Sequence, residues 1–254
     1  MQTSQLLPAL RAAGERMAEA AEEAGLSASV PSCPGWTVRD LLFHTGSVHR
    51  WAASIVGKTG DKHQRVIGGD PLKDAEYRPA DDKLLTWFRE GHAELVRTLE
   101  AAPEDLDVWH FLPASTPLSF WVRRQTHETI VHRVDAEQAG GSITPIDPDV
   151  ALDGLNELLI GFLPRRRHKL RSDEPKTMVV QTTDRPLAWR LSISTEPVVC
   201  EPVLDPGEAD AFVRGPAERL YLALWNRAPL SSVETSGDEQ LLRSWSASVQ
   251  VTWN

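Results

Sequence analysis

The spacing of apolar residues changes part way along this chain, and the change constrains the fold more than any other feature of the sequence. Up to about residue 162, apolar side chains recur every three or four residues, which is typical of helices that bury one face. From about residue 177, short segments separated by turn residues predict strands instead. With 254 residues, the chain is long enough for two domains. We therefore predict a helical domain followed by an α/β domain.

The first half of the chain predicts four helices separated by segments that contain proline and glycine. Their predicted ranges are 4–24, 37–56, 81–102 and 119–139. Thr37 and Asp40 form a capping-box pattern at the start of the second helix, and Gly140-Gly141 is a stop signal after the fourth. Four helices with one long polar loop, over residues 57–79, suit a bundle whose inward side chains can build a site.

The second half predicts shorter elements around a change of domain. A helix over 150–162 is followed by the basic run 165–169; strands are predicted at 177–182, 187–194, 211–213 and 246–253, and a further helix at 216–225. The predicted domains are a helical bundle over 1–145, a helix and basic linker over 146–170, and an α/β domain over 171–254.

Charge and cysteine content exclude several classes of protein. The formal net charge of −9 argues against binding a phosphate backbone as the main role. The two cysteines, Cys33 and Cys200, are far apart and do not suggest a disulfide framework. The first residues lack a signal-peptide pattern, and no uncharged apolar run reaches the ~18 residues that span a bilayer. We expect a cytoplasmic monomer or small homo-oligomer that binds neither nucleic acid nor membrane.

Glu128 and His132 carry the strongest chemical signal. They are four residues apart, so they share one face of the predicted helix, whereas the five-residue spacing of His127 and His132 excludes the zinc-protease motif. His44 falls in the apolar stripe of the second helix. Two inward imidazoles and one inward carboxylate can bind a divalent metal and leave a position open for a ligand. The same pattern also fits a helix-surface ion pair beside a hydrogen-bonded core histidine.

Other polar residues on the same helix are candidates for supporting roles. Asp135 and Gln125 lie on the side of Glu128 and His132, and a metal-bound histidine usually donates its second N–H to a carboxylate or carbonyl. Asp135 could equally form an ordinary salt bridge. The arginines of this helix would face either a bound ligand or water; they are Arg123, Arg124 and Arg133.

Three segments resemble the mycothiol-dependent maleylpyruvate isomerase family. They are Pro31-Ser32-Cys33-Pro34-Gly35-Trp36-Thr37-Val38-Arg39-Asp40-Leu41-Leu42-Phe43-His44, Glu128-Thr129-Ile130-Val131-His132-Arg133-Val134-Asp135-Ala136 and, more loosely, Gly215-Pro216-Ala217-Glu218-Arg219-Leu220-Tyr221-Leu222-Ala223-Leu224-Trp225-Asn226-Arg227. The matches occur in the order of the family's segments and span most of the chain. The resemblance implies a two-domain α + α/β fold, in which an N-terminal DinB-like four-helix bundle precedes a smaller α/β domain that resembles sterol carrier proteins.

The resemblance also implies a function. It points to a zinc-dependent enzyme in which His44, Glu128 and His132 bind the metal and mycothiol is the thiol cosubstrate. Such enzymes isomerise an electrophilic small molecule or transfer the thiol to it. The family's substrate-binding arginine corresponds best to Arg227, whose other interpretation is a structural arginine at a helix end. The ligand set also suits iron or manganese.

Two other interpretations remain open on the sequence. The chain could be a non-catalytic module that binds a metal or a small ligand. It could also be a metal-free relative, in which His44 is a hydrogen-bonded core histidine. Metal analysis and a test of turnover separate the three.

Overall fold

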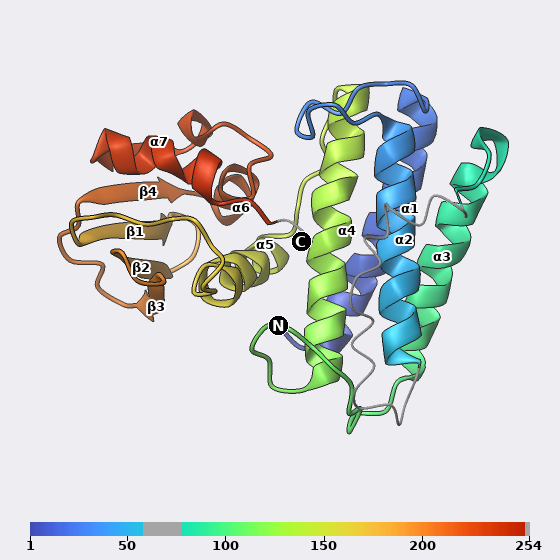
Figure 1. The fold of residues 1–254 in the computed structure, drawn as a ribbon, viewed down its shortest axis with the longest axis horizontal. Helices are drawn as coiled ribbons and strands as arrows, with labels where there is room; N and C mark the ends of the chain where they lie inside the picture. Colours follow the sequence, from blue (N-terminus) through green and yellow to red (C-terminus); the bar gives the residue numbers. More distant parts are fainter. Residues whose placement is uncertain (58–77, 252–254) are drawn as a thin grey trace. The chain divides into compact units, whose positions relative to one another are not determined.

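The computed structural model describes residues 1–57 and 78–251, so most of the predicted polar loop 57–79 lies outside the described residues. The chain divides into two compact units, Met1–Thr144 and Pro145–Trp253 (Figure 1). The first is helical, and the second combines helices with a mixed sheet. Within the described ranges, every helix is too short or too polar to span a bilayer.

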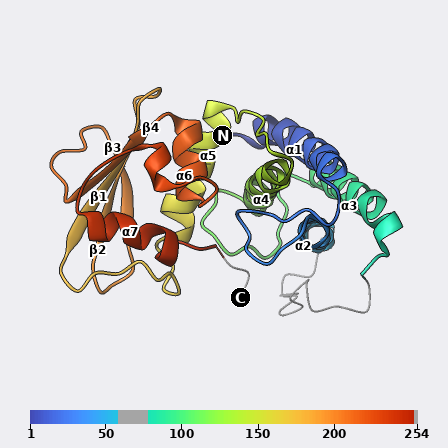
Figure 2. The ribbon, with the colours of Figure 1, turned by 90° about the horizontal axis from the view of Figure 1, so that it is seen from above.

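The described part of the first unit contains α1 (Thr3–Ala24), α2 (Val38–Val56), α3 (Asp81–Ala101) and α4 (Pro117–Gly140). The predicted helices begin and end within two residues of these bounds. Helix α1 contacts α3 and α4, and α2 packs on the same two helices, as the view along them shows (Figure 2). This arrangement places side chains of α2 and α4 opposite each other inside the unit.

The ends of α2 and α4 follow from local hydrogen bonds. At the start of α2 the backbone N–H of Thr37 donates to Asp40 Oδ2 at 3.0 Å, as the capping-box pattern predicts. At the start of α4 the Ser119 N–H donates to Thr116 Oγ1 at 3.1 Å. Gly141 ends α4 with φ of 95°, a left-handed conformation that favours glycine. These caps fix where the inward face of each helix begins.

Helix α4 differs from an ordinary surface helix because its buried residues include many polar and charged ones. They are Arg124, Gln125, Thr126, His127, Glu128, Thr129, His132, Arg133, Asp135 and Glu137. Burying so many polar groups is costly unless they bind one another or a ligand. Helix α4 is therefore where a functional site is expected.

The second unit contains a five-stranded sheet in the order β3-β2-β1-β4-β5. Its strands are β1 (Lys176–Thr182), β2 (Ala188–Ile193), β3 (Val199–Val203), β4 (Ala211–Gly215) and β5 (Glu234–Gly237). β1 and β4 pair in parallel, and the other neighbouring strands are antiparallel. The sheet is therefore mixed.

Helical segments complete the second unit. They are α5 (Pro148–Asn156), the π-helical η2 (Glu157–Phe162), α6 (Ala217–Leu224), the short η3 (Leu230–Ser232) and α7 (Glu239–Ser248). Three buried tryptophans connect these helices and the sheet, and the indole N–H of each one donates a hydrogen bond. Trp189 donates to Asn156 Oδ1 at 2.8 Å. Trp225 donates to the Gly154 carbonyl at 3.2 Å, and Trp245 donates to the Leu224 carbonyl at 3.1 Å. The unit has its own core.

The prediction of a final strand over residues 246–253 is wrong for the residues that the structure describes. Helix α7 extends to Ser248, and no strand follows it up to residue 251. Leu241 and Trp245 are buried and four residues apart, and the Asp238 side chain accepts from the Leu241 N–H at 3.0 Å. The cap at Asp238 and the helical spacing of Leu241 and Trp245 favour a helix here, although the residues from 246 onwards alternate as in a strand.

Candidate metal centre

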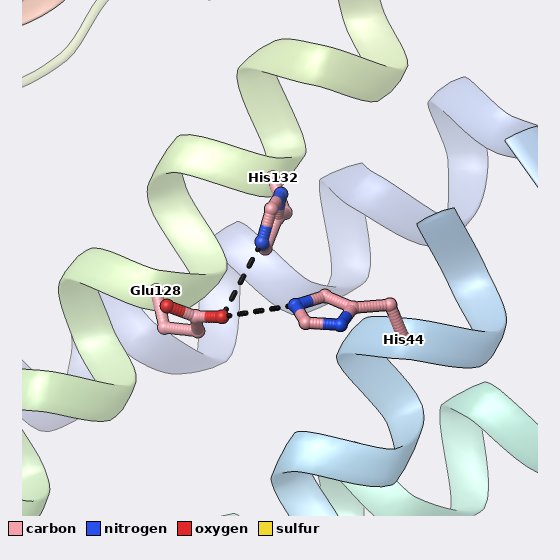
Figure 3. Close-up of side chains that lie close together, drawn as sticks. All are labelled: His44, Glu128 and His132. Carbon is pink, nitrogen blue, oxygen red and sulfur yellow. Dashed lines mark hydrogen bonds and ion pairs between the residues drawn. The ribbon is translucent and has the colours of Figure 1, made fainter. Parts of the chain in front are cut away.

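His44 of α2 and the pair Glu128 and His132 of α4 converge inside the first unit (Figure 3). Nε2 of His44 lies 3.4 Å from Glu128 Oε1, and Nε2 of His132 lies 3.3 Å from the same oxygen. One candidate ligand atom from each residue lies within 4.8 Å of the other two. All three residues are at least nine-tenths buried, with exposed fractions of 5%, 4% and 8%.

The helices explain this convergence. Glu128 and His132 are one turn apart, so α4 presents both side chains on one face. His44 lies on the buried face of α2, where the indole of Trp36 packs edge-on against its ring at 5.1 Å between centroids. The rings of His44 and His132 are 5.0 Å apart and nearly perpendicular.

Asp135 orients His132. Nδ1 of His132 lies 2.8 Å from Asp135 Oδ2, and a carboxylate can only accept, so Nδ1 carries the hydrogen and Nε2 is left facing Glu128. The predicted contact between these residues is confirmed. Asp135 in turn accepts hydrogen bonds from Ser32 Oγ and, at 3.6 Å, from Cys33 Sγ. Neither spacing nor periodicity predicts the contact of Ser32 with Asp135, because the two residues are 103 positions apart.

Arg124 holds the other side of Glu128. Its Nη2 donates to Glu128 Oε2 at 2.9 Å, and the whole arginine is inaccessible to solvent. Arg133 is also buried and donates to the Thr144 carbonyl at 3.1 Å. The expectation that these two arginines face water is therefore wrong, because both are buried and donate to groups of the protein itself. The four-residue spacing of Arg124 and Glu128 was a signal that could have revealed this pair.

Charges in the site oppose the effect of burial. Burial alone would raise the pKa of Glu128, but hydrogen bonds from His132 and His44, together with the positive charges of His132 and Arg124, hold it well below its usual range. Burial lowers the pKa of His132, yet Asp135 and Glu128 outweigh it and raise that pKa to about 8. The site therefore favours an anionic carboxylate next to positive charge.

Gln125 does not join this network. It is fully buried on the same face of α4, but neither its Nε2 nor its Oε1 hydrogen-bonds to any residue that the structure describes. The hypothesis that Gln125 supports the ligands by hydrogen bonding is not borne out.

The three residues fit a divalent metal. Two imidazole nitrogens and one carboxylate oxygen are typical zinc ligands, and iron or manganese also accept them. Glu128 Oε1 faces two imidazole nitrogens, so the point between them suits a positive charge, either a metal ion or protons on the histidines. Three protein ligands leave further coordination positions for another molecule.

Arg227 belongs to the second unit, whereas all three candidate ligands belong to the first. It follows α6, where its Nη1 donates to the Trp225 carbonyl at 2.9 Å and its backbone N–H to the Leu222 carbonyl at 2.7 Å. The preceding Asn226 is left-handed, with φ of 59°. These contacts show that Arg227 closes the end of α6.

Comparisons with known proteins agree on one group. The sequence profile described as "Mycothiol maleylpyruvate isomerase N-terminal domain" matches residues 7–137, and that described as "MDMPI C-terminal domain" matches residues 149–244. Two crystal structures of the mycothiol-dependent maleylpyruvate isomerase, one of a mutant, are similar to this chain with TM-scores of 0.65 and 0.64. Each is 14% identical to it, and the alignment covers 93% of both chains. No curated protein matches the sequence.

Proposed function

Because the chain belongs to the mycothiol-dependent maleylpyruvate isomerase family, we propose that it is an enzyme that uses mycothiol, a low-molecular-weight thiol, to isomerise an electrophilic small molecule or to transfer the thiol to it. The convergence of His44, Glu128 and His132 carries the proposal, because these residues could hold a metal ion, and a bound ion would activate a thiol. Maleylpyruvate is one substrate to test among several electrophiles.

In this proposal His44, Glu128 and His132 hold a divalent metal, with zinc preferred from the family resemblance. The bound ion would supply positive charge that lowers the pKa of a coordinated thiol, so that the thiolate is available at neutral pH. A thiolate is the nucleophile that adds to an activated double bond.

The residues around the ligands prepare the site. Asp135 fixes the tautomer and orientation of His132, so that Nε2 faces the site. Glu128 is kept anionic by its neighbours. Because the three residues are nearly inaccessible to water, electrostatic interactions among them are weakly screened.

Arg227 would hold a carboxylate of an acidic substrate. A guanidinium can bind both oxygens of a carboxylate in one plane, which orients the substrate as well as attracting it. Its Nη1 donates to the Trp225 carbonyl, a contact that ties the guanidinium to the end of α6.

Metal analysis combined with a thiol-consumption assay tests this function. The purified protein should contain about one equivalent of divalent metal, and it should consume mycothiol or isomerise substrate when offered maleylpyruvate and a panel of other electrophiles. The His132→Ala variant should lose the metal and the activity while keeping its circular dichroism spectrum. The His110→Ala variant, which removes a histidine outside the site, should keep both.

Each outcome has a distinct meaning. Full metal occupancy in His132→Ala would show that the ligands are wrongly assigned. Metal and thiol binding without turnover of any electrophile would instead support the non-catalytic binding module. A wild-type protein without stoichiometric metal would support the metal-free relative.

A further inference from the structure

The two carboxylate oxygens of Glu128 have different partners. Oε1 lies 3.4 Å from His44 Nε2 and 3.3 Å from His132 Nε2, at the centre of the candidate metal site. Oε2 accepts from Arg124 Nη2 at 2.9 Å. One oxygen thus faces the point where a metal would lie, and the other is occupied by a cation of the protein.

The arrangement of Arg124 makes this division rigid. The residue is fully buried, and it lies one helical turn before Glu128, so the backbone of α4 sets the distance between the two side chains. A buried guanidinium is strongly destabilised if it loses its carboxylate partner, because it cannot turn to water for a replacement. Glu128 therefore cannot swing Oε2 towards a metal without breaking this buried ion pair.

We propose that Arg124 is a positioning residue that restricts Glu128 to binding the metal through Oε1 alone. A carboxylate that binds through both oxygens occupies two coordination positions, and one that binds through a single oxygen occupies one. With one nitrogen from each histidine and one oxygen from Glu128, the ion keeps a further position for the thiol sulfur. This inference rests on the proposed function and assigns a role to a residue outside the three ligands.

The charge of Arg124 acts in the same direction. Sharing the Glu128 charge with a guanidinium reduces the negative charge that the carboxylate gives to the ion. The ion therefore attracts an added anionic sulfur more strongly than it would beside an unpaired carboxylate. Loss of Arg124 should reduce thiol binding both by filling a coordination position and by weakening this attraction.

Cobalt(II) substitution tests the proposal without any activity measurement. The visible absorption of protein-bound Co²⁺ is intense at low coordination number and weak when the ion gains ligands. The protein, freed of metal and reloaded with Co²⁺, should show a several-fold weaker band in Arg124→Met than in the wild type. The affinity for mycothiol, followed by the sulfur-to-cobalt charge-transfer band, should fall roughly tenfold or more. Arg124→Lys keeps the charge and should recover part of both losses.

Arg133→Met is the matched control. Arg133 is another buried arginine of α4, but its Nη2 donates to the Thr144 carbonyl and its Nε lies 3.6 Å from Glu137 Oε2. Its variant should keep the wild-type cobalt spectrum and thiol affinity. A folded Arg124→Met protein with both properties unchanged would overturn the proposal and make Arg124 a purely structural partner of Glu128.

A measurement on the wild type keeps the proposal testable if Arg124→Met does not fold. In a crystal structure of the zinc-loaded wild type, Glu128 should bind the ion through Oε1, with Oε2 still on Arg124; both oxygens on the ion would refute it. The proposed function has a separate test. If mycothiol does not change the spectrum of the Co²⁺-loaded wild type, the protein does not bind the thiol at the metal. The difference in spectrum between the wild type and Arg124→Met without mycothiol still decides the role of Arg124.

Discussion

Ser32 and Asp135 connect the segment before α2 to the metal-facing side of α4. Asp135 is fully buried, accepts from Ser32 Oγ and Cys33 Sγ, and receives the Nδ1–H of His132. The Asp135 carboxylate thus links the segment that contains Ser32 and Cys33 to His132, a candidate metal ligand. The negative charge of Asp135 matters as well as the shape of its side chain, because the charge favours the tautomer of His132 that carries its hydrogen on Nδ1.

Replacing Asp135 with asparagine tests this role. Asp135→Asn keeps the size of the side chain but removes the charge, so His132 should be less well oriented and a poorer ligand. We expect metal affinity to fall by roughly 10- to 100-fold, measured by competition with a chromogenic chelator. Ser32→Ala should cause a smaller loss, since Cys33 still contacts Asp135. Unchanged affinity in Asp135→Asn would show that the carboxylate has no such role.

For single residues, the sequence predicts contacts between side chains of the same helix, but few contacts between residues of different segments. Spacing placed Glu128 and His132 on one face, and it brought Asp135 within reach of His132. Periodicity could not pair His44 with them, because its spacing shows only that it points inward on a different helix. The contact of Ser32 with Asp135 depends on tertiary packing and has no local pattern.

The helices of the first unit pack so closely that an added Cβ would overlap a neighbouring side chain at several glycines, including Gly14, Gly46 and Gly91. A Cβ atom at Gly14 of α1 would overlap the ring of His92 on α3. Nε2 of His92 lies 3.1 Å from the Leu10 carbonyl oxygen of α1 and therefore donates a hydrogen bond to it. The glycine therefore allows α1 and α3 to approach, with the imidazole between them.

Gly14→Ala should therefore destabilise the protein, although alanine is normally the better helix former. We expect the free energy of unfolding to fall by about 1–3 kcal/mol, because the ring of His92 has to move. Gly140→Ala is the control: the nearest atom to its added Cβ is that of Ala24 at 3.9 Å, so this substitution should be neutral or slightly stabilising. Urea unfolding of both variants checks the prediction; a stabilised Gly14→Ala would contradict the packing argument.

Two buried histidines make the helical unit sensitive to acid. His49 of α2 has Nε2 at 2.9 Å from Thr129 Oγ1, and its ring lies 5.3 Å from that of His92. Burial lowers the pKa of both side chains; His92 and His49 also repel each other's charge, which adds to the effect at His49. Both imidazoles are therefore neutral in the folded core.

The sign of the pH dependence follows from proton uptake. Above the ordinary pKa of 6.5, these histidines are neutral in both folded and unfolded chains; below it, the unfolded chain takes up protons that the folded core does not. Stability should fall as the pH drops from about 6.5 towards the lowered values. The raised pKa of His132, about 8, acts in another window: its stabilisation is complete below 6.5 and lost as the pH rises through 8.

His92→Gln should make the acid-side loss of stability shallower, because one of the two suppressed titrations is removed. Urea unfolding of chelator-treated wild type and variant between pH 5 and 6.5 measures the two slopes. The titrations of His132 and of the carboxylates occur in both proteins and therefore cancel in the comparison. Equal slopes would show that His92 is not a source of acid sensitivity.

Element type was predictable where the periodicity was strong and unreliable where local composition was misleading. The long helices of the first unit match their predicted ranges closely. Strand β3 contains Pro202, which argues against a strand, and β5 consists of exposed polar residues without alternation, so neither was predicted. The strand predicted over 246–253 overlaps the end of helix α7, which begins at the cap residue Asp238, well before the alternating segment. The helix predicted over 150–162 winds as a π-helix in its last turn, which spacing does not reveal.

Across the whole molecule the candidate ligands and the candidate substrate arginine lie in different units, so their roles can be separated. Arg227→Lys should leave metal affinity unchanged and lower kcat/KM for a carboxylate-bearing electrophile by roughly 10- to 100-fold, as for a lost charge-assisted hydrogen bond. Arg219→Ala, which removes an exposed arginine of α6, should have no effect on either quantity. Steady-state kinetics alongside metal titration distinguishes these outcomes, and an unaffected kcat/KM in Arg227→Lys would leave Arg227 only its role at the end of α6.

The change of apolar spacing along the sequence predicts a helical region followed by a region with strands. The structure contains both, and the strands form a mixed sheet. The DinB-like and sterol-carrier-like assignments remain predictions from the family resemblance. The order of strands in the sheet could not be read from the sequence, because the parallel pairing of β1 with β4 brings together segments separated by two other strands.

Helix α4 supplies Arg124, Glu128, His132 and Asp135 from a single continuous stretch of twelve positions, whereas His44 comes from α2. Deleting one codon between Glu128 and His132 would turn everything beyond it by roughly 100° about the helix axis. The imidazole and its carboxylate partner would then point into a neighbouring helix, even though every chemical group is still encoded. For this stretch of gene, small in-frame deletions should be more damaging than most missense changes.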